Sequence, residues 1–253
     1  ADIYGARPGV SETLFGQALK DTGIDRDEIV IVSKFGMDMD GANGTDHGVR
    51  GSRRYIMRAI EASLGRLGTD YIDLYFHHTP DPVTPVEETL GALATLIEQG
   101  KVRYIGSANH SGWQIAQAEY IGRQLGTRYI AAENHYNLLD RRAELEVLPA
   151  AREFGLGVLP YFPLANGLLT GKYNPGKEAV EGRLTRIKPE LLDSTDWDQM
   201  RAFSEFAAER GLTEVQVAFS WLAQQHPVSS VIAGATTIDQ VRTNAAAIAT
   251  RFS

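Results

Sequence analysis

The sequence predicts an α/β protein built from repeated strand–helix units, and a (β/α)8 TIM barrel is the architecture that fits it best. Short apolar runs alternate along the chain with amphipathic stretches of helical periodicity, which is typical of parallel βα units. A doubly wound sheet usually carries a Gly-x-Gly-x-x-Gly turn after its first strand, and this sequence has none. The strands are evenly spaced and no composition shift marks a linker, so we expect a single domain over residues 1–253.

Composition excludes several classes of protein. The chain contains no cysteine, which rules out disulfides, thiolate catalysis and Cys-ligated metals. Its formal net charge of -7 argues against a nucleic-acid or anionic-membrane partner, although a local pocket can still bind an anion. No apolar run approaches transmembrane length and we expect no signal peptide, so a cytoplasmic protein is predicted. No residues have metal-ligand spacing, and we therefore expect no metal site.

The first elements follow from caps and periodicity. A helix is expected over residues 11–20 with Ser11 as its N-cap, and its apolar face would be formed by Leu14, Phe15, Ala18 and Leu19. A continuous apolar strand over residues 28–34 ends in Lys34 and leads into a Gly/Asp-rich loop over residues 38–51. Ser52 should cap the next helix, whose buried side would carry Ile56, Ile60, Leu64 and Leu67.

Residues 71–82 form the most informative stretch: Tyr-Ile-Asp-Leu-Tyr-Phe-His-His-Thr-Pro-Asp-Pro. The apolar run predicts a buried strand that delivers an imidazole to the mouth of a sheet or barrel, where the Pro-Asp-Pro turn breaks the chain. Histidine is the side chain best suited to proton transfer or hydrogen-bond donation near neutral pH. Residues 84–87, Thr-Pro-Val-Glu, then predict a capping box with proline at the first helical position and a helix to about Gln99.

The alternation continues to the end of the chain. Further strands are expected at residues 102–106, 129–133, 156–161 and 229–233, and further helices after Ser111, over 141–154, near 197–210 and 214–225, and from about Ile238. Residues 162–189 are Gly-rich and expected to be irregular. Six strands cannot close an eight-stranded barrel, so we expect two strands upstream of Ala1, and we expect the C-terminal tail to be missing as well.

The chemistry of a βα barrel sits where its strands end. The residues at those positions are Tyr4, Lys34, His77, His78, Asn109, Glu133, Tyr161 and the segment 234–236. A tyrosine, a lysine and a histidine from different strand ends form a proton-transfer set. The charge of a lysine favours the phenolate and lowers the pKa of a tyrosine, and a histidine can donate to a substrate oxygen.

Motifs along the whole chain carry a family resemblance. They are Asp-Ile-Tyr-Gly at 2–5, Ser-Lys-Phe-Gly at 33–36, Gly-Thr-Asp-Tyr-Ile-Asp-Leu-Tyr at 68–75, His-Thr-Pro-Asp-Pro at 78–82, Gly-Lys-Val-Arg-Tyr-Ile-Gly at 100–106, Leu-Leu-Asp-Arg-Arg at 138–142, Pro-Leu-Ala-Asn-Gly-Leu-Leu-Thr-Gly-Lys-Tyr at 163–173 and Val-Ile-Ala-Gly-Ala-Thr at 231–236. With these motifs in this order, the chain resembles an aldo-keto reductase of the bacterial type that is related to the potassium-channel β-subunits.

The resemblance implies a TIM barrel that binds NADP(H) without a Rossmann domain and reduces a small-molecule aldehyde or ketone. By matching motifs, Tyr4 would be the general acid, Lys34 the partner that lowers its pKa, and His78 the donor that orients the carbonyl. His77 points the other way from the strand and would be a packed neighbour. The family also uses an aspartate five positions before the tyrosine, which would lie two residues before Ala1.

The same resemblance implies a set of cofactor residues. Asn109 matches the asparagine that binds the nicotinamide carboxamide, Tyr161 matches the aromatic residue that stacks on the nicotinamide, and Glu133 stands where the family usually has glutamine. Ala108 stands where it usually has serine. Glu133 could still accept a hydrogen bond from the carboxamide, but one side-chain donor is lost at each of these two positions. Leu164 and Gly167 would line the pyrophosphate. The phosphate- and adenine-binding turn and helix start would comprise Gly234, Ala235, Thr236, Gln240 and Asn244, where helix N-terminal N–H groups suit a phosphate.

Other assignments and alternatives stay open. His47, His110 and Trp113 are candidates for lining the substrate pocket, and an oligomer is possible. An NADPH-binding regulatory or structural subunit with little turnover is the alternative to a reductase. A Schiff-base aldolase that uses Lys34 is a further alternative, but it would not account for Tyr4 or the segment 231–236.

Overall fold

The computed structural model describes residues 1–173 and 182–250, and the chain divides into two compact units. Unit 1 comprises Ala1–Glu133 and Pro149–Leu156, and unit 2 comprises Asn134–Leu148 and Gly157–Ser253. The single domain expected over residues 1–253 stays a prediction.

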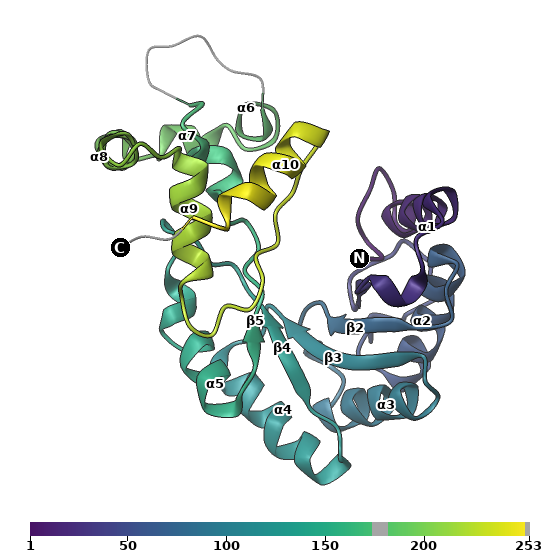
Figure 1. Ribbon diagram of the computed structural model, residues 1–253. Coiled ribbons are helices and arrows are strands. Elements are labelled where there is room, and N and C mark those ends of the chain that lie inside the picture. Colours follow the sequence, from purple (N-terminus) through teal and green to yellow (C-terminus); the bar gives the residue numbers. More distant parts are fainter. Residues whose placement is uncertain (174–181, 251–253) are drawn as a thin grey trace. The chain divides into compact units, whose positions relative to one another are not determined.

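Strands and helices alternate along unit 1. Its elements are α1 (Val10–Thr22), the 3-10 helix η1 (Arg26–Glu28), β1 (Val32–Phe35), α2 (Arg53–Leu67), β2 (Ile72–His77), α3 (Val86–Glu98), β3 (Val102–Ala108), α4 (Gly112–Leu125) and β4 (Tyr129–Glu133). The strands β1, β2, β3 and β4 pair in this order, all parallel, and α2, α3 and α4 follow one another along the outer face of the sheet (Figure 1). The predicted α/β class with a parallel sheet is therefore confirmed, and the arrangement is consistent with a (β/α)8 barrel.

The strand register brings the carboxyl ends of the strands to one edge of the sheet. Lys34 pairs with Phe76 and Phe76 with Gly106, while Ala108 pairs with Glu133 at the end of β4. Position 106 has room only for glycine, because a Cβ there would lie 2.5 Å from the Phe76 ring and 2.9 Å from the carbonyl oxygen of Ala131. Close packing of the strands at this point therefore depends on a missing side chain.

The prediction for the buried face of α1 is wrong. Leu14 and Phe15 are exposed, with relative exposures of 66% and 44%, and the buried residues of the helix are Glu12 and Gly16. Gly16 lies against α2, since a Cβ at this position would come within 2.5 Å of the carbonyl oxygen of Leu67. Glu12 is buried because its carboxylate pairs with Arg66 at 2.8 Å and accepts a hydrogen bond from Ser33.

Two local predictions near β1 and α3 also differ from the structure. β1 begins at Val32 rather than at residue 28, because residues 26–28 form η1, which is capped by the Asp25 carboxylate. Thr84 does not cap α3: its hydroxyl donates to Asp81 at 2.7 Å, and the N-cap position is Pro85. The Asp81 carboxylate also accepts from the N–H of Val83, so an aspartate turn takes the place of the capping box.

The helix predicted over residues 141–154 is interrupted. It is divided into the 3-10 helix η2 (Arg142–Glu144) and α5 (Val147–Phe154). Pro149 lies in the first turn of α5, where its missing N–H is tolerated, but it has no N–H to donate to a carbonyl oxygen within a helix that began earlier. The remaining elements are β5 (Gly157–Val158), the 3-10 helix η3 (Ala165–Thr170), α6 (Arg183–Ile187), α7 (Glu190–Asp193), α8 (Trp197–Glu209), α9 (Glu214–Ala223) and α10 (Ile238–Ala247).

The strand predicted at residues 229–233 is not formed. Val228 makes an isolated parallel bridge with Val158, and the N–H of Ser229 donates to the carbonyl oxygen of Val158 at 2.9 Å. One further bond joins the N–H of Ile232 to Pro160 at 3.0 Å. Residues 229–233 are apolar enough for a strand, but the neighbouring strand β5 has only two residues. It therefore offers too few backbone groups for a second strand to pair with.

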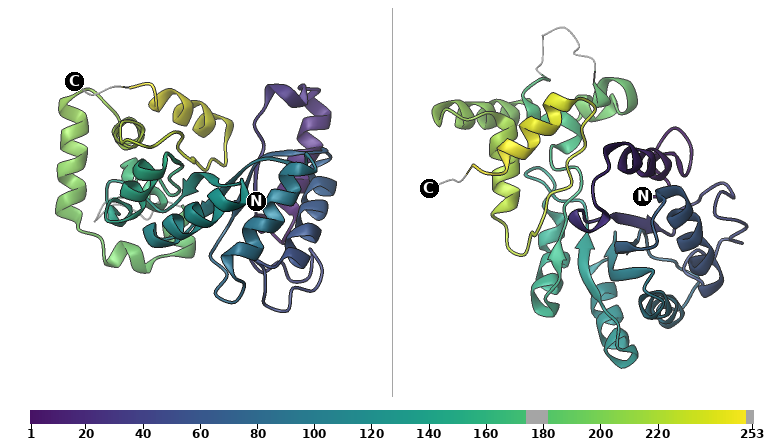
Figure 2. Two further views of the ribbon diagram at one scale, coloured as in Figure 1. Left: turned by 90° about the horizontal axis from the view of Figure 1, so that it is seen from below. Right: turned by 45° about the vertical axis from the view of Figure 1, so that its right-hand side comes forward.

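Unit 2 has its own apolar cluster. It consists of Ala165, Leu169, Met200 and Ala218, packed by Leu138, Leu139, Leu164, Leu168, Trp197 and Phe203. The last helix, α10, lies alongside α9 (Figure 2), and its Ala247 carbonyl accepts a hydrogen bond from the buried hydroxyl of Ser220 at 3.0 Å. Within residues 1–173 and 182–250, no helix combines the length and apolar character needed to cross a membrane.

Candidate active site

Tyr4 and His78 meet in unit 1. The Tyr4 hydroxyl lies 3.5 Å from Nε2 of His78, and the two rings are perpendicular with centroids 5.7 Å apart. Tyr4 precedes α1 and keeps 49% of its surface exposed, whereas His78 directly follows β2 and is buried. The solvent-exposed phenol of Tyr4 therefore contacts the buried imidazole of His78.

The pKa of His78 is lowered to about 3, first by burial and then by the positive charge of Lys34. Both effects disfavour an imidazolium ion. His78 is therefore neutral at neutral pH, and a neutral imidazole with its proton on Nε2 can donate one hydrogen bond toward the Tyr4 hydroxyl or toward an oxygen that binds beside it.

Lys34 lies at the end of β1, beside this pair. Its Nζ is 5.4 Å from the centroid of the Tyr4 ring and 5.9 Å from that of Phe76. It forms an ion pair with Glu133, whose Oε2 lies 3.0 Å from Nζ, and both side chains are almost fully buried. Burial raises the pKa of Glu133, and the charge of Lys34 opposes that shift.

His77 faces the packed layer next to His78. Its ring stacks on Phe35 with centroids 5.0 Å apart and an interplanar angle of 5°, and it meets His110 edge to face. His77 is thus a packing residue, as the sequence predicts. Burial lowers the pKa of His77 to about 3 and that of His110 to about 4.

The candidate substrate residues lie in three different settings. His110 is buried between His77 and Tyr129, and its Nδ1 lies 3.0 Å from the carbonyl oxygen of Ala108. His47 is exposed in the loop over residues 38–51, with φ of 54°. Trp113 is 63% exposed in the first turn of α4. A substrate role for each of them stays a prediction.

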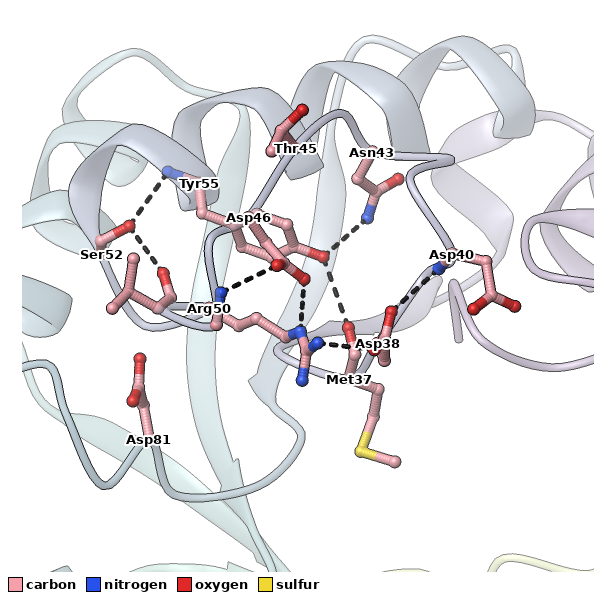
Figure 3. A network of polar contacts seen from close by, with 12 residues as sticks. Met37, Asp38, Asp40, Asn43, Thr45, Asp46, Arg50, Ser52, Tyr55 and Asp81 are labelled. Carbon is pink, nitrogen blue, oxygen red and sulfur yellow. Dashed lines mark hydrogen bonds and ion pairs between the residues drawn. The ribbon is translucent and has the colours of Figure 1, made fainter.

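The loop over residues 38–51 is held by ion pairs (Figure 3). Nε of Arg50 lies 2.5 Å from Asp46 and a second guanidinium nitrogen lies 2.7 Å from Asp38. The N–H of Gly48 also donates to Asp46, and this bond, with that from Arg50, lowers the pKa of Asp46. Asp81 accepts from the N–H of Gly51 at 2.6 Å and so ties the end of the loop to the turn after β2.

Asn109 connects the ends of β2 and β4. Its Nδ2 donates to the carbonyl oxygen of His78 at 2.8 Å, and its backbone N–H donates to that of Glu133 at 3.0 Å. Its φ of 61° is in the left-handed region, where asparagine is tolerated better than most residues. The position therefore joins His78 and Glu133 through backbone contacts.

Tyr161, in unit 2, is stacked against His135. The ring centroids are 5.3 Å apart with an interplanar angle of 13°, and Phe162 meets Tyr161 edge to face. His135 is in turn oriented by Asp140, whose carboxylate lies 3.1 Å from Nδ1. Leu164 and Gly167 follow in and beside η3, where Gly167 has φ of 107° and needs the freedom of glycine.

The segment from Gly234 to Asn244 borders a hollow of about 250 Å³ in unit 2. The hollow is lined by Phe219, Val231, Ala233, Ala235, Val241, Asn244, Ala245 and Ile248. Thr237 caps α10, the N–H of Thr236 donates to Oε1 of Gln240 at 2.7 Å, and residues 233–237 are exposed. An apolar wall with one amide, next to the N-terminus of a ten-residue helix, suits a flat ring that carries a phosphate, so these residues fit the adenosine end of a nicotinamide cofactor.

Three features within the two units were not predicted. They are the ion pair between Lys34 and Glu133, the Arg50 clamp on the 38–51 loop, and the support of Tyr161 by His135. The charged residues at two strand ends were visible in the sequence, but nothing in their spacing paired them. The clamp had a signal in the Asp-x-x-x-Arg spacing of residues 46–50.

Comparison with known proteins gives a consistent result. The sequence model of the aldo/keto reductase family matches residues 1–253. An L-glyceraldehyde 3-phosphate reductase from Escherichia coli (strain K12) is 34% identical over 256 residues, which cover 98% of this chain and 73% of the relative. An uncharacterized oxidoreductase, YrpG, from Bacillus subtilis (strain 168) is 36% identical over 246 residues, 96% of this chain and 74% of the relative. A probable voltage-gated potassium channel subunit beta from Oryza sativa subsp. japonica is 35% identical over 256 residues, 98% of this chain and 76% of the relative.

Proposed function

Because the chain belongs to the aldo/keto reductase family of oxidoreductases, we propose that it reduces an aldehyde or ketone to the corresponding alcohol with NADPH as the hydride donor. The observation that carries this proposal is the approach of the Tyr4 hydroxyl to Nε2 of His78, at 3.5 Å, beside the ammonium group of Lys34. These groups can deliver a proton and hydrogen bonds to a carbonyl oxygen.

When bound, the cofactor would supply the hydride that adds to the carbonyl carbon. Tyr4 gives its phenolic proton to the carbonyl oxygen, so that its O–H bond breaks as that of the alcohol forms. His78, which is neutral, donates a hydrogen bond to the same oxygen and orients it. Lys34 stabilises the phenolate that remains, and solvent returns a proton to Tyr4, whose side chain is 49% exposed.

The residues that would hold the cofactor are those implied by the family motifs. In unit 2, the adenine and phosphate end would be held by Gly234, Ala235, Thr236, Gln240 and Asn244, and the pyrophosphate by Leu164 and Gly167. The family motifs give Tyr161 the role of stacking on the nicotinamide and Asn109 that of binding the carboxamide. The hollow beside Asn244 and the capped start of α10 support the first of these assignments.

Titration of the protein with NADPH, followed by nicotinamide fluorescence, tests binding, and the same titration with NADH tests the preference. Loss of NADPH absorbance with a panel of aldehydes and ketones tests turnover. Glyceraldehyde 3-phosphate belongs in the panel because a relative is named for its reduction. Tyr4→Phe should abolish reduction and leave NADPH binding unchanged, whereas Tyr104→Phe, at another exposed tyrosine, should leave both unchanged. Reduction that survives in Tyr4→Phe would show that Tyr4 is not the acid.

A second candidate function is an NADPH-binding regulatory or structural subunit. The relatives that are named potassium channel β-subunits, at 35% and 36% identity, favour keeping it. It differs from the reductase in one measurable respect, because such a subunit binds NADPH without oxidising it. Single-turnover mixing of the NADPH-loaded protein with the carbonyl panel separates the two: full retention of NADPH absorbance with every compound supports the subunit.

A further inference from the structure

One face of the Tyr161 ring lies against the imidazole of His135 in unit 2. The ring centroids are 5.3 Å apart with an interplanar angle of 13°, and the same two residues form an isolated parallel bridge between their backbones. The N–H of Tyr161 donates to the carbonyl oxygen of Asn134 at 3.2 Å. The backbone therefore brings the two residues together, and the stack does not depend on ring contact alone.

The imidazole of His135 is held at both of its nitrogens. Nδ1 lies 3.1 Å from a carboxylate oxygen of Asp140, and Nε2 lies 3.2 Å from Nδ2 of Asn137. An amide nitrogen only donates, so Nε2 accepts this bond and the ring proton is on Nδ1, from where it donates to Asp140. Burial lowers the pKa of His135, although the charge of Asp140 opposes this shift. The contacts thus select a neutral ring in one tautomer and one orientation.

The side-chain amide of Asn137 is itself fixed by the turn that it belongs to. Its Oδ1 accepts the N–H groups of Leu139 at 2.9 Å and of Asp140 at 2.8 Å, which directs Nδ2 toward His135. Nδ2 also donates to the carbonyl oxygen of Phe162 at 2.9 Å. Asn137 is only 1% exposed or less than most of its neighbours, being buried in this turn. A buried amide that is hydrogen-bonded at both ends therefore connects His135 to Phe162.

Phe162, the residue after Tyr161, has a strained backbone. Its φ of 53° lies in the left-handed region, which a phenylalanine rarely adopts. Its ring meets both His135 and Tyr161 edge to face, with centroids 5.4 Å and 5.1 Å away. Strain of this kind persists where the surrounding contacts over-determine the conformation, and it is concentrated at positions that bind ligands. The strained turn therefore indicates that a particular placement of the Tyr161 ring is required.

We propose that His135 is a positioning residue for Tyr161: together with Asn137 and Asp140, it fixes the plane of the Tyr161 ring on which the nicotinamide stacks. The inference rests on the proposed function, which gives Tyr161 its role in stacking. A ring that is already fixed loses less conformational freedom when a ligand binds, so the support should be measurable as cofactor affinity. His135 acts through Tyr161 and not by contact with the cofactor.

The first experiment uses the protein without cofactor. The ring nitrogens and ring protons of His135 are observed by 1H–15N correlation NMR at neutral pH, and their signals are identified by their absence in His135→Gln. The proton should be on Nδ1. The ring-proton shifts should change in Tyr161→Leu, because the ring current of the stacked tyrosine is lost. A proton on Nε2 in the unmodified protein, or ring signals that Tyr161→Leu leaves in place, would overturn the proposal.

The second experiment is a double-mutant cycle on NADPH affinity, followed by nicotinamide fluorescence. His135→Leu removes the ring and should raise the dissociation constant by about 2- to 10-fold, the range expected for one aromatic pair. In a Tyr161→Leu background the same change should raise it no further. His135→Phe keeps a ring that can stack and should bind NADPH more tightly than His135→Leu. Equal affinities of these two variants, or an undiminished loss in the Tyr161→Leu background, would refute the proposal.

Tyr120→Leu is the matched control. Tyr120, in α4 of unit 1, also forms an aromatic pair, with the Phe154 centroid 5.9 Å away. Its replacement removes a ring from a pair outside the cofactor residues, and it should change neither the NADPH affinity nor the His135 signals. If no form of the protein binds NADPH, the proposed function fails, and the spectra of the first experiment still decide whether His135 is held against Tyr161 in one tautomer.

Discussion

His77 and His78 are adjacent in sequence but have different surroundings at the end of β2. His77 stacks on Phe35 in the packed layer, whereas Nε2 of His78 lies 3.5 Å from the hydroxyl of Tyr4. Successive side chains of a strand point to opposite faces, so one imidazole is buried in packing and the next reaches the strand end. Burial keeps both of them neutral at neutral pH, since it lowers the pKa of each to about 3.

We expect His77 to make the protein sensitive to acid. Its pKa is about 3 in the folded state and 6.5 in the unfolded chain, so between these values the unfolded chain binds a proton that the folded protein does not. Stability therefore falls as the pH falls through this window. His77→Phe removes this contribution. Between neutral pH and about pH 5, the free energy of unfolding of the variant should therefore fall by about 2 kcal/mol less than that of the unmodified protein. Urea unfolding across the pH range measures the slope.

His47→Asn is the control for this slope. His47 is exposed in the loop over residues 38–51, and asparagine accepts its positive φ of 54°. The variant should keep the pH dependence of the unmodified protein. An equal flattening of the slope in both variants would rule out burial of His77 as the cause.

Asp2→Asn should have the opposite pH dependence. Burial and the charge of Glu12 raise the pKa of Asp2 to about 7, from 3.8 in the unfolded chain. The folded protein therefore holds a proton that the unfolded chain has lost, and the stability this provides disappears as the pH rises from about 4 to about 7. Asparagine cannot ionise and keeps an acceptor for Nδ2 of Asn43, which lies 3.1 Å from Asp2. We compare the free energy of unfolding of the variant with that of the unmodified protein at two pH values. The difference should be more favourable to the variant by about 2 kcal/mol or more at about pH 8 than at about pH 4.

Denaturant titrations at the two pH values measure this difference, and Asp70→Asn is the control. Asp70 is exposed between α2 and β2, so its replacement should change stability equally at both values. If Asp2→Asn shows no larger pH effect than Asp70→Asn, then Asp2 is not protonated in the folded protein.

Gly106→Ala should destabilise the sheet of unit 1 by about 2–3 kcal/mol, because its Cβ would meet the Phe76 ring and a backbone oxygen of β4. Gly91→Ala is the matched change in the middle of α3, where no atom lies within 4 Å of the added Cβ. It should instead stabilise the protein by about 0.5–1 kcal/mol through helix propensity. Chemical unfolding of both variants checks the contrast, which equal effects of one sign would contradict.

Arg50→Gln should loosen the loop over residues 38–51 with little effect on global stability. Arg50 contacts both Asp46 and Asp38, but it is 27% exposed, and partly exposed ion pairs contribute less than about 1 kcal/mol. Limited digestion with thermolysin, which does not cleave at arginine, should be several-fold faster within the loop. Arg54→Gln, at an exposed arginine of α2, should be cleaved at the rate of the unmodified protein. Equal rates for the two variants would mean that Arg50 does not hold the loop.

Much of the secondary structure was predictable because its signals are local. The caps at Ser52 and Ser111 and the start of α10 at Ile238 are where the sequence places them, since capping depends on residues three or four positions apart. The pattern failed where a tertiary contact competed with it. Asp81 bonded the Thr84 hydroxyl that was expected to cap α3, and Gly16 was buried against α2 in place of the apolar face of α1.

The sequence by itself determined the α/β class and placed Lys34 and His78 at or directly after the ends of β1 and β2. Periodicity and turn chemistry are properties of neighbouring residues, so they can be read without a structure. Only the tertiary structure decided that Lys34 is held by Glu133, because an ion pair between β1 and β4 depends on strand register and on the depth of both side chains. Burial makes this ion pair energetically important, since a charge removed from water needs the partner that the fold places beside it.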